Sequence, residues 1–519
     1  MISSVFYTVN MQTTKLKPVF KLAAFNREVL RTFAAASNDN STKLDTNLKS
    51  WKEIPGPSSL PLIGQLHHFL PGGELSKFAE QGELKKLFNK YGPLVRFEGM
   101  FGVGTMIFVC DPELSAHVLR SENWMPLRPG FVSLEHYRKV YRKGKGQTRV
   151  TGLMTDHGEA WKEIRSTVNP VMLQPKTIKL YCNVLDEVAM DMINRMKAER
   201  DEKNMLRKSY GSEMDLWALE SICTVALGLR LNCLDSSLPD DSPEKQLIRC
   251  IQELFVTSVQ LDFSPNLWKY FSTPLFKKTM KLYELHESLT KHFLKKGIEQ
   301  LKRNDRKSEH EKGVLEKLLD IDEDIAYIMA SDMLFAGVDT TANTLTGILY
   351  LLATHQEKQD KLREEILSKT ERRPYLKACY KEGLRIMPTV TGNLRKTSKE
   401  YDLLGFKIPK DINLIFAHRD MSLMDENYPQ ADQYIPERWI ADKHDPLYYG
   451  NAHPFAHAPF GFGVRSCIGR RIAELEIETF LSRIIENFQV EWHGPPPTIH
   501  QASINYVKGP FYFVFNDVK

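Results

Sequence analysis

The sequence predicts a mainly α-helical protein with small β-sheets. From about residue 150 to residue 390, apolar residues recur at helical spacing in long amphipathic segments with few interior prolines. Residues 95–110 and 403–416 are instead rich in β-branched and aromatic residues and are broken by glycine and proline, which indicates short strands. Apolar residues make up 42% and charged residues 26% of the 519 residues, which is ordinary for a globular protein with a large core.

Cysteine content and net charge exclude several classes of protein. The seven cysteines are few for this length and odd in number, and no CxxC pair occurs. Neither a disulfide framework nor a zinc site is therefore indicated, and a reducing compartment fits best. The net charge of +5 is mild and gives no reason to expect a nucleic-acid partner.

The N-terminal residues 1–36 have the composition of a targeting segment. They contain five lysines and arginines against the single acid Glu28, together with frequent hydroxyl residues. No uninterrupted apolar run approaches the roughly 20 residues that span a bilayer. We therefore expect an organellar transit peptide over residues 1–36 and a catalytic domain over residues 37–519. A disordered basic tail is the alternative.

Residues 460–469 set Cys467 among closely spaced glycines. Such a loop suits a thiolate presented to an iron, because small residues let the backbone approach a flat macrocycle and free N–H groups can bond the sulfur. An apolar, helix-forming stretch follows from Ile472, and a helix that starts there turns its positive end toward the thiolate. The alternative for a lone cysteine is a buried free thiol that acts as a small core residue.

Residues 324–354 predict a long helix with an interruption in its middle. Gly337 weakens helical structure, and the hydroxyl of Thr340 can divert backbone hydrogen bonds. Asp339 beside this hydroxyl can hold water and pass protons. The alternative is a core helix kinked at Gly337, with Thr340 bonded to its own backbone.

Two further pairs share a helix face. Glu382 and Arg385 stand three residues apart, and Trp161 and Arg165 stand four apart. On a surface helix, a pair such as Glu382 and Arg385 contributes only about 0–1 kcal/mol.

Together these segments resemble the cytochrome P-450 superfamily. The cysteine loop matches the haem-binding pattern FxxGxRxCxG at every fixed position, and the segment from Ala336 to Thr341 is similar to the oxygen-activation motif. Glu382 and Arg385 match ExxR. Pro436–Trp439 resembles the PERF segment, with tryptophan where phenylalanine is common. The resemblance covers about residues 51–519 and implies a single triangular, α-rich domain with buried haem b (iron protoporphyrin IX).

The resemblance assigns a role to each matching residue. Cys467 is the expected axial thiolate ligand, Asp339 and Thr340 deliver protons to oxygen, and Glu382, Arg385 and Arg438 form a structural network behind the haem. The expected cofactor contacts are Trp161, Arg165, Ala336, Gly337, Arg395, Phe460, Gly463, Arg465 and Gly469.

The expected electron donor follows from the mitochondrial branch of the superfamily, whose insect members are the most similar. Lys377 and Lys381, four apart, match lysines that dock an adrenodoxin-like two-iron ferredoxin, which receives electrons from an NADPH reductase. A solvated basic stripe is the alternative. The resemblance implies a monooxygenase peripherally bound to the inner mitochondrial membrane on the matrix side, acting on a lipophilic substrate in hormone metabolism or xenobiotic (insecticide) breakdown.

Two other functions stay open at this point. One is a haem-thiolate isomerase or dehydratase acting on a peroxide, and the other is a non-catalytic haem sensor. Intact Asp339 and Thr340 and the paired lysines argue against the isomerase or dehydratase, and the oxygen-activation helix would be superfluous in a sensor. The substrate is expected to contact residues 125–147, residues 252–276 and the helix near Leu334.

One segment departs from the family pattern. Arg363 lies only nineteen residues before Glu382, a shorter connection than in most relatives. The stretch Thr370-Glu371-Arg372-Arg373 marks the place where a surface helix is missing. Either the lineage lost this helix or the gene model dropped an exon edge. The missing segment would affect ferredoxin docking more than haem binding.

Overall fold

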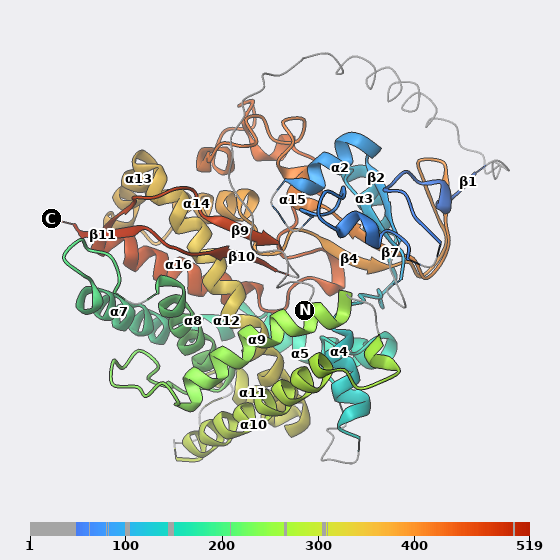
Figure 1. Ribbon diagram of the computed structural model, residues 1–519. Helices are drawn as coiled ribbons and strands as arrows, with labels where there is room; N and C mark the ends of the chain where they lie inside the picture. The colour runs from blue at the N-terminus through green and yellow to red at the C-terminus, as the bar shows by residue number, and fades with distance from the viewer. Residues whose placement is uncertain are drawn as a thin grey trace. The chain divides into compact units, whose positions relative to one another are not determined.

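The computed structural model describes residues 48–518 apart from positions 62, 79, 81, 99–103, 144–149, 208, 264–266, 304–307, 309 and 502–503. The chain divides into two units, Met1–Leu48 and Lys49–Lys519. The elements named here belong to the second unit. It is mainly α-helical with small sheets, as the sequence predicts (Figure 1). The expected transit peptide at residues 1–36 lies outside the described residues and stays a prediction.

The helices account for most of the second unit. They are α2 (Glu83–Tyr91), α3 (Pro112–Arg120), α4 (Val132–His136), α5 (Gly158–Met172), α6 (Pro175–Lys179), α7 (Cys182–Glu199), α8 (Tyr210–Ala226), α9 (Pro243–Phe263), α10 (Pro274–Arg303), α11 (Val314–Ile321), α12 (Glu323–Thr354), α13 (Gln356–Leu367), α14 (Pro374–Ile386), α15 (His418–Ser422) and α16 (Arg470–Asn487). Short helical turns are η1 (Trp51–Glu53), η2 (Leu66–Phe69), η3 (Tyr137–Tyr141), η4 (Leu267–Lys269), η5 (Pro436–Trp439), η6 (Tyr449–Asn451) and η7 (Gly463–Arg465).

The strands form separate small sheets. They are β1 (Lys49–Ser50), β2 (Leu94–Phe97), β3 (Met106–Val109), β4 (Asn393–Lys396), β5 (Tyr401–Leu403), β6 (Phe406–Ile408), β7 (Asn413–Phe416), β8 (Phe488–Trp492), β9 (Thr498–Gln501), β10 (Asn505–Lys508) and β11 (Phe513–Asp517). The strand orders are β2-β3-β7-β4, β1-β6-β5, β10-β9 and β11-β8. The strands expected within residues 95–110 and 403–416 are confirmed, whereas β8 to β11 were not predicted.

Helix α12 is the central element of the core. Asp322 caps its start by accepting the N–H of Ile325 at 3.1 Å, and Glu323 and Asp324 complement the helix dipole in the first turn. The helix is buried on nearly every side and packs along α8 (Figure 1). Such all-round burial is typical of a core helix in a large protein.

The interruption expected near Gly337 is absent, because α12 is one continuous α-helix. A Cβ at Gly337 would lie 2.6 Å from Cγ1 of Ile222 in α8. The glycine is therefore explained by the close approach of two helices.

Helices α13 and α14 are joined directly by residues 368–373, where the family pattern predicted a longer connection. The carboxylate of Glu365 in α13 accepts the N–H groups of Tyr375 and Leu376 in α14, each at 2.8 Å. Arg373 donates to the hydroxyl of Ser482 in α16 at 3.0 Å. Both ends of the short connection are thus fixed. Among the described residues, no helix is both long and apolar enough to cross a membrane.

Candidate active site

Cys467 lies in the loop between η7 and α16, and backbone geometry holds it there. Its N–H donates to the carbonyl of Phe460 at 2.8 Å, and the N–H of Gly469 bonds the sulfur. Gly463 has φ +70°, and a Cβ built there meets no atom within 4 Å. The loop therefore combines a left-handed turn that favours glycine with open space in front of it.

Accessible side chains occur on the cysteine loop and on one face of α12. The side chain of Cys467 is exposed, yet burial by the surrounding protein raises the pKa of its thiol. The sulfur is thus accessible although protein surrounds it, as expected for a residue that borders an internal space. On α12, Ala336 is exposed and Thr340 partly exposed, although Phe335 and Val338 beside them are buried. Ala336 and Thr340 are four apart and so share one face of the helix.

Arg165 and Arg465 flank the cysteine loop. Arg165 in α5 donates to the carbonyl of Ser466 at 2.8 Å, while its Nε is buried without a hydrogen-bond partner. The guanidinium of Arg465 stacks 3.7 Å from the ring centroid of Trp161. Trp161 and Arg165, which share one face of α5, thus both contact the cysteine loop. Arg465 donates to three backbone carbonyls, those of Pro126, Leu153 and Asp156.

Arg395 in β4 approaches the same loop from the sheet. It donates to the carbonyl of Phe462 at 3.2 Å and forms an ion pair with Glu122 at 2.7 Å. The register of β4 against β7, with Arg395 opposite Leu414, fixes its place. The strand position expected for Arg395 is confirmed.

Arg128 was missed by the sequence reasoning. Its charge interacts with Cys467 and with Arg395, and burial lowers the pKa of its guanidinium. The flanking Pro126-Leu127-Arg128-Pro129 run, a cation held between two prolines, was the available signal. We call Arg128, Arg165, Arg395 and Arg465 the open arginine cluster.

The open arginine cluster carries more positive than negative charge. Burial and then repulsion by Arg128, Arg395 and Arg165 lower the pKa of the Arg465 guanidinium. Among the described residues, the ion pair that the cluster forms is that between Arg395 and Glu122. Buried cations without counter-charge are costly, and arginine forks bind carboxylates bidentately. The donor set of these residues therefore fits the two propionates of a haem, which the four arginines would hold.

Asp339 and Thr340 make different contacts on α12. The hydroxyl of Thr340 donates to the carbonyl of Ala336 at 2.7 Å, as the alternative interpretation of this helix requires. Asp339 accepts the hydroxyl of Tyr506 in β10 at 3.1 Å, and its other carboxylate oxygen is buried without a partner. Burial raises the pKa of Asp339 to about 6, against the effect of the Tyr506 hydrogen bond.

The closed arginine cluster consists of Glu382, Arg385 and Arg438, all fully buried. The carboxylate of Glu382 joins the two arginines. Glu382 accepts from Arg385 at 2.7 Å and from Arg438 at 2.9 Å, and each side chain has 0% exposure. The other guanidinium N–H groups donate to backbone carbonyls of residues 422, 429–431 and 433. Trp439 donates its indole N–H to Glu382 at 2.9 Å, a bond that the commoner phenylalanine cannot make.

Lys377 and Lys381 lie on α14 and differ in exposure. Lys377 is exposed, whereas Lys381 is half-buried with its ammonium 5.5 Å from the ring centroid of Trp439. Burial lowers the pKa of Lys381, and the nearby Glu474 opposes this. The two lysines lie close enough to interact electrostatically, as expected.

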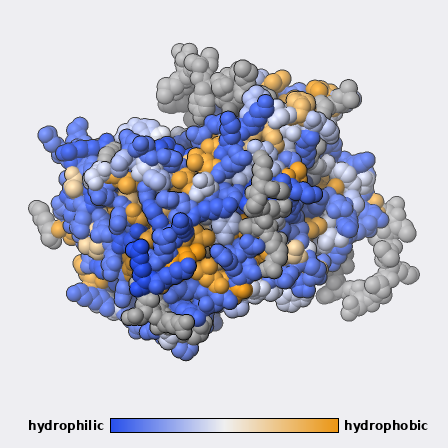
Figure 2. Space-filling model, turned by 90° about the horizontal axis from the view of Figure 1, so that it is seen from below, coloured by the Kyte–Doolittle hydropathy of each residue, from blue (hydrophilic) through white to orange (hydrophobic). Residues whose placement is uncertain are grey.

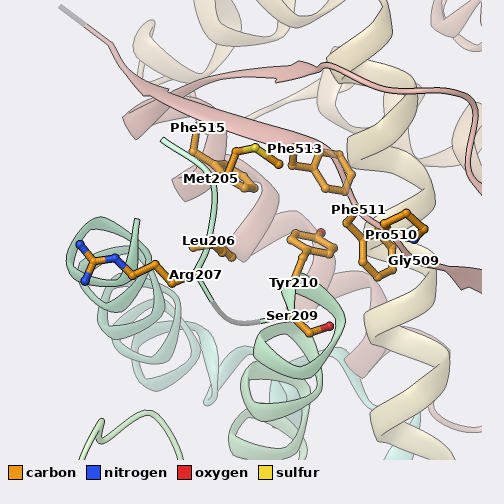
Figure 3. Close-up of a pocket in the computed structure, with 10 residues that line it drawn as sticks. All are labelled: Met205, Leu206, Arg207, Ser209, Tyr210, Gly509, Pro510, Phe511, Phe513 and Phe515. Atoms are coloured by element: carbon orange, nitrogen blue, oxygen red, sulfur yellow. The ribbon is translucent and has the colours of Figure 1, made fainter. Parts of the chain in front are cut away.

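A separate cavity of about 310 Å³ lies between the start of α8 and β11 (Figure 3). Tyr210 lies against Phe511 and Phe513, with ring centroids 5.1 and 4.5 Å away, while Arg207 points away from these rings. The lining contains none of the predicted site residues.

Comparison with known proteins identifies the class to which this fold and cysteine loop belong. The family model described as Cytochrome P450 matches residues 54–514, so the chain belongs to the cytochrome P450 family. It is a haem enzyme of the monooxygenase type, with a cysteine thiolate as axial ligand.

Particular relatives are insect proteins. Cytochrome P450 CYP12A2 of Musca domestica is 36% identical over 508 residues, covering 92% of this chain and 94% of that protein. Probable cytochrome P450 12a5, mitochondrial, of Drosophila melanogaster is 34% identical over 494 residues and 91% of both chains. Probable cytochrome P450 12b2, mitochondrial, of the same species is 34% identical over 479 residues, 88% of this chain and 87% of that one. The expected likeness to the insect mitochondrial branch is confirmed.

Proposed function

We propose that this protein is a mitochondrial haem-thiolate monooxygenase that inserts one oxygen atom of O2 into a lipophilic substrate, with Cys467 as the iron ligand. The observation that carries the assignment is the accessible sulfur of Cys467 in a glycine-rich loop, bordered by the open arginine cluster. The haem, when bound, supplies the iron that activates oxygen for insertion into a C–H bond.

The chain's own residues would prepare this chemistry in three ways. The N–H of Gly469 bonds the sulfur of Cys467 and so stabilises its negative charge. The open arginine cluster would bind the propionates of the haem. Asp339, whose pKa burial raises to about 6, would take up and release a proton at its unpartnered oxygen, next to the accessible face of α12 on which Thr340 lies.

The closed arginine cluster serves as a rigid support in this proposal. It joins α14 to the segment around η5, and Lys381 lies on its outer side over Trp439. Electrons would reach the site from a two-iron ferredoxin docked near Lys377 and Lys381. The exposed Lys377 supports this proposal, because rim cations steer an acidic partner.

The membrane contact is proposed from exposed apolar residues that follow α9. Leu267, Tyr270 and Phe271 have exposures of 45%, 83% and 58%. The face that carries α9 and α10 shows hydrophobic surface among hydrophilic side chains (Figure 2). Peripheral binding to the matrix side of the inner membrane would bring a lipophilic substrate to this side of the protein. A role in hormone metabolism or xenobiotic breakdown is part of the same proposal.

Replacement of Cys467 tests the assignment. Cys467→Ala is expected to abolish the red-shifted, thiolate-type Soret band of the reduced carbon-monoxide complex, because no sulfur remains in the loop. Cys182→Ala is the matched control, since Cys182 is a partly exposed free cysteine on α7 outside the site. A thiolate-type band that persists in Cys467→Ala would disprove the assignment. NADPH consumption with ferredoxin and reductase then separates oxygenation from peroxide isomerisation and from haem sensing.

A further inference from the structure

The cavity between the start of α8 and β11 has no part in the proposed function (Figure 3). Phe511, Phe513 and Phe515 line it as alternate residues of one extended segment, and alternate residues of an extended chain point to the same side. Tyr210, the first residue of α8, faces this segment. Its ring lies 6.2 Å from that of Phe515, with the two planes within 14° of each other. Four aromatic rings therefore border one space.

The interior of the cavity is uncharged. Among the described residues that line it, Arg207 is the charged one, and its guanidinium points away from the rings (Figure 3). Met205 and Leu206 complete the apolar wall. An ionic ligand would lose its hydration here without meeting a counter-charge, which is costly. The cavity therefore fits a neutral ligand.

The size of the cavity limits the ligand to a small molecule. Its volume of about 310 Å³ lies at the lower end of the roughly 300–1,000 Å³ of small-molecule sites. Aromatic rings prefer offset or edge contacts with other rings at centroid distances of about 4.5–7 Å. The lining residues Ser209, Gly509 and Pro510 are exposed, so the cavity can be reached from solvent. A molecule with one aromatic ring satisfies both the size and the chemistry of this wall.

The turn that follows β10 forms part of the wall and connects the cavity to α12. In β10, the hydroxyl of Tyr506 donates to the carboxylate of Asp339 at 3.1 Å. The next residue, Val507, donates its N–H to Oδ1 of Asn343 at 3.1 Å. Both acceptors belong to α12. A ligand that packs against the turn therefore restrains the strand that bonds Asp339.

We propose that this cavity is a second ligand site, which binds a small neutral aromatic molecule and thereby holds β10 against α12. The site is separate from the accessible face of α12 at Ala336 and Thr340, because none of the described lining residues belongs to α12. Binding there requires neither haem nor oxygen and so is independent of the proposed function.

Fluorobenzene is the probe, because it is neutral, has one ring and carries no strong iron ligand. The full-length, haem-loaded protein is titrated with it, and the ¹⁹F NMR linewidth reports the bound fraction. Binding beside the iron is followed separately through the Soret band. Phe511→Ala, which removes one ring of the wall, should weaken the binding that leaves the Soret band unchanged by about tenfold. Phe69→Ala, at an exposed phenylalanine of η2 outside the lining, is the matched control and should bind as the wild type does.

A second variant fills the cavity instead of enlarging it. Leu206→Trp places a larger side chain in the wall and should abolish the Soret-silent binding, whereas Leu180→Trp, at an exposed leucine outside the lining, should not. The reduced carbon-monoxide spectrum shows whether each variant keeps an intact haem site. Weaker Soret-silent binding in both cavity variants supports the proposal. Equal binding in the wild type and both cavity variants overturns it. Absence of Soret-silent binding in the wild type also overturns it, because the cavity is then only a packing gap.

Hydrogen exchange tests the connection to α12 and needs the wild type alone. With fluorobenzene bound, the N–H of Val507 should exchange several-fold more slowly, because the strand that carries it opens less often. This protection should be lost in Leu206→Trp. An exchange rate at Val507 that fluorobenzene does not change overturns the restraint of β10, even where the probe binds.

Discussion

Two groups of arginines, the closed and the open arginine cluster, differ in how their charge is balanced. In the closed arginine cluster, Arg385 and Arg438 share Glu382 and donate their remaining N–H groups to backbone carbonyls. In the open arginine cluster, burial and then repulsion by the other three arginines lower the pKa of Arg465, and Arg165 keeps a buried N–H without a partner. The first group is complete within the protein, and the second has donors left for an anionic ligand.

The largest effect is expected from Glu382→Gln in the closed cluster. The substitution removes the negative charge that two fully buried arginines share, so the folded state should lose about 3–5 kcal/mol. Thermal unfolding and the yield of the reduced carbon-monoxide complex measure the loss. Trp439→Phe, which removes one hydrogen bond to the same carboxylate, should cost only about 1 kcal/mol. Equal effects of the two variants would contradict the importance of the shared charge.

An intermediate effect is expected from Arg128→Gln in the open cluster. Removal of one of four repelling charges should leave the stability of the haem-free protein unchanged or raised. Haem binding should weaken by about 1.5–3 kcal/mol, the contribution of a charged hydrogen bond. The rate of haem transfer to apomyoglobin reports the affinity, and Arg128→Lys should transfer haem more slowly than Arg128→Gln. If Arg128→Gln destabilises the haem-free protein, the charge of Arg128 is balanced within the protein, as in the closed arginine cluster.

The smallest effects are expected at the edge of the closed cluster. Lys377→Gln should slow ferredoxin-supported turnover at low salt and leave stability unchanged, because this lysine is exposed. Lys381→Gln should also lower stability by about 0.5–1 kcal/mol, since its ammonium lies over Trp439. Stopped-flow reduction at two ionic strengths and thermal unfolding separate the two effects. Identical behaviour of both variants would show that the Trp439 contact contributes nothing.

The sequence predicted those parts of the site that lie within short motifs. Glu382 and Arg385 are three residues apart, and helical geometry alone places them together. The glycines around Cys467 indicated a backbone under special constraint, and Gly463 indeed has positive φ. The helix at residues 324–354 was also predicted within a residue of its observed bounds.

Contacts between distant segments could not be read in the same way. Arg128 meets the cysteine loop, and Tyr506 meets Asp339, across more than 160 residues of chain in each case. The reason for Gly337 was misread, because nothing near it in the sequence shows that Ile222 packs against it.

The short connection between α13 and α14 is a place where residues can be inserted or deleted and where a label can be attached. Residues 368–372 are all exposed, while Glu365 and Arg373 fix the chain at either side. Loop-closure entropy grows slowly with length, at about 0.6 kcal/mol for each doubling. Segments can therefore be gained or lost here during evolution with little effect on folding. The same turn offers a position for an inserted tag or a fluorophore beside Lys377, from which the arrival of a redox partner can be followed.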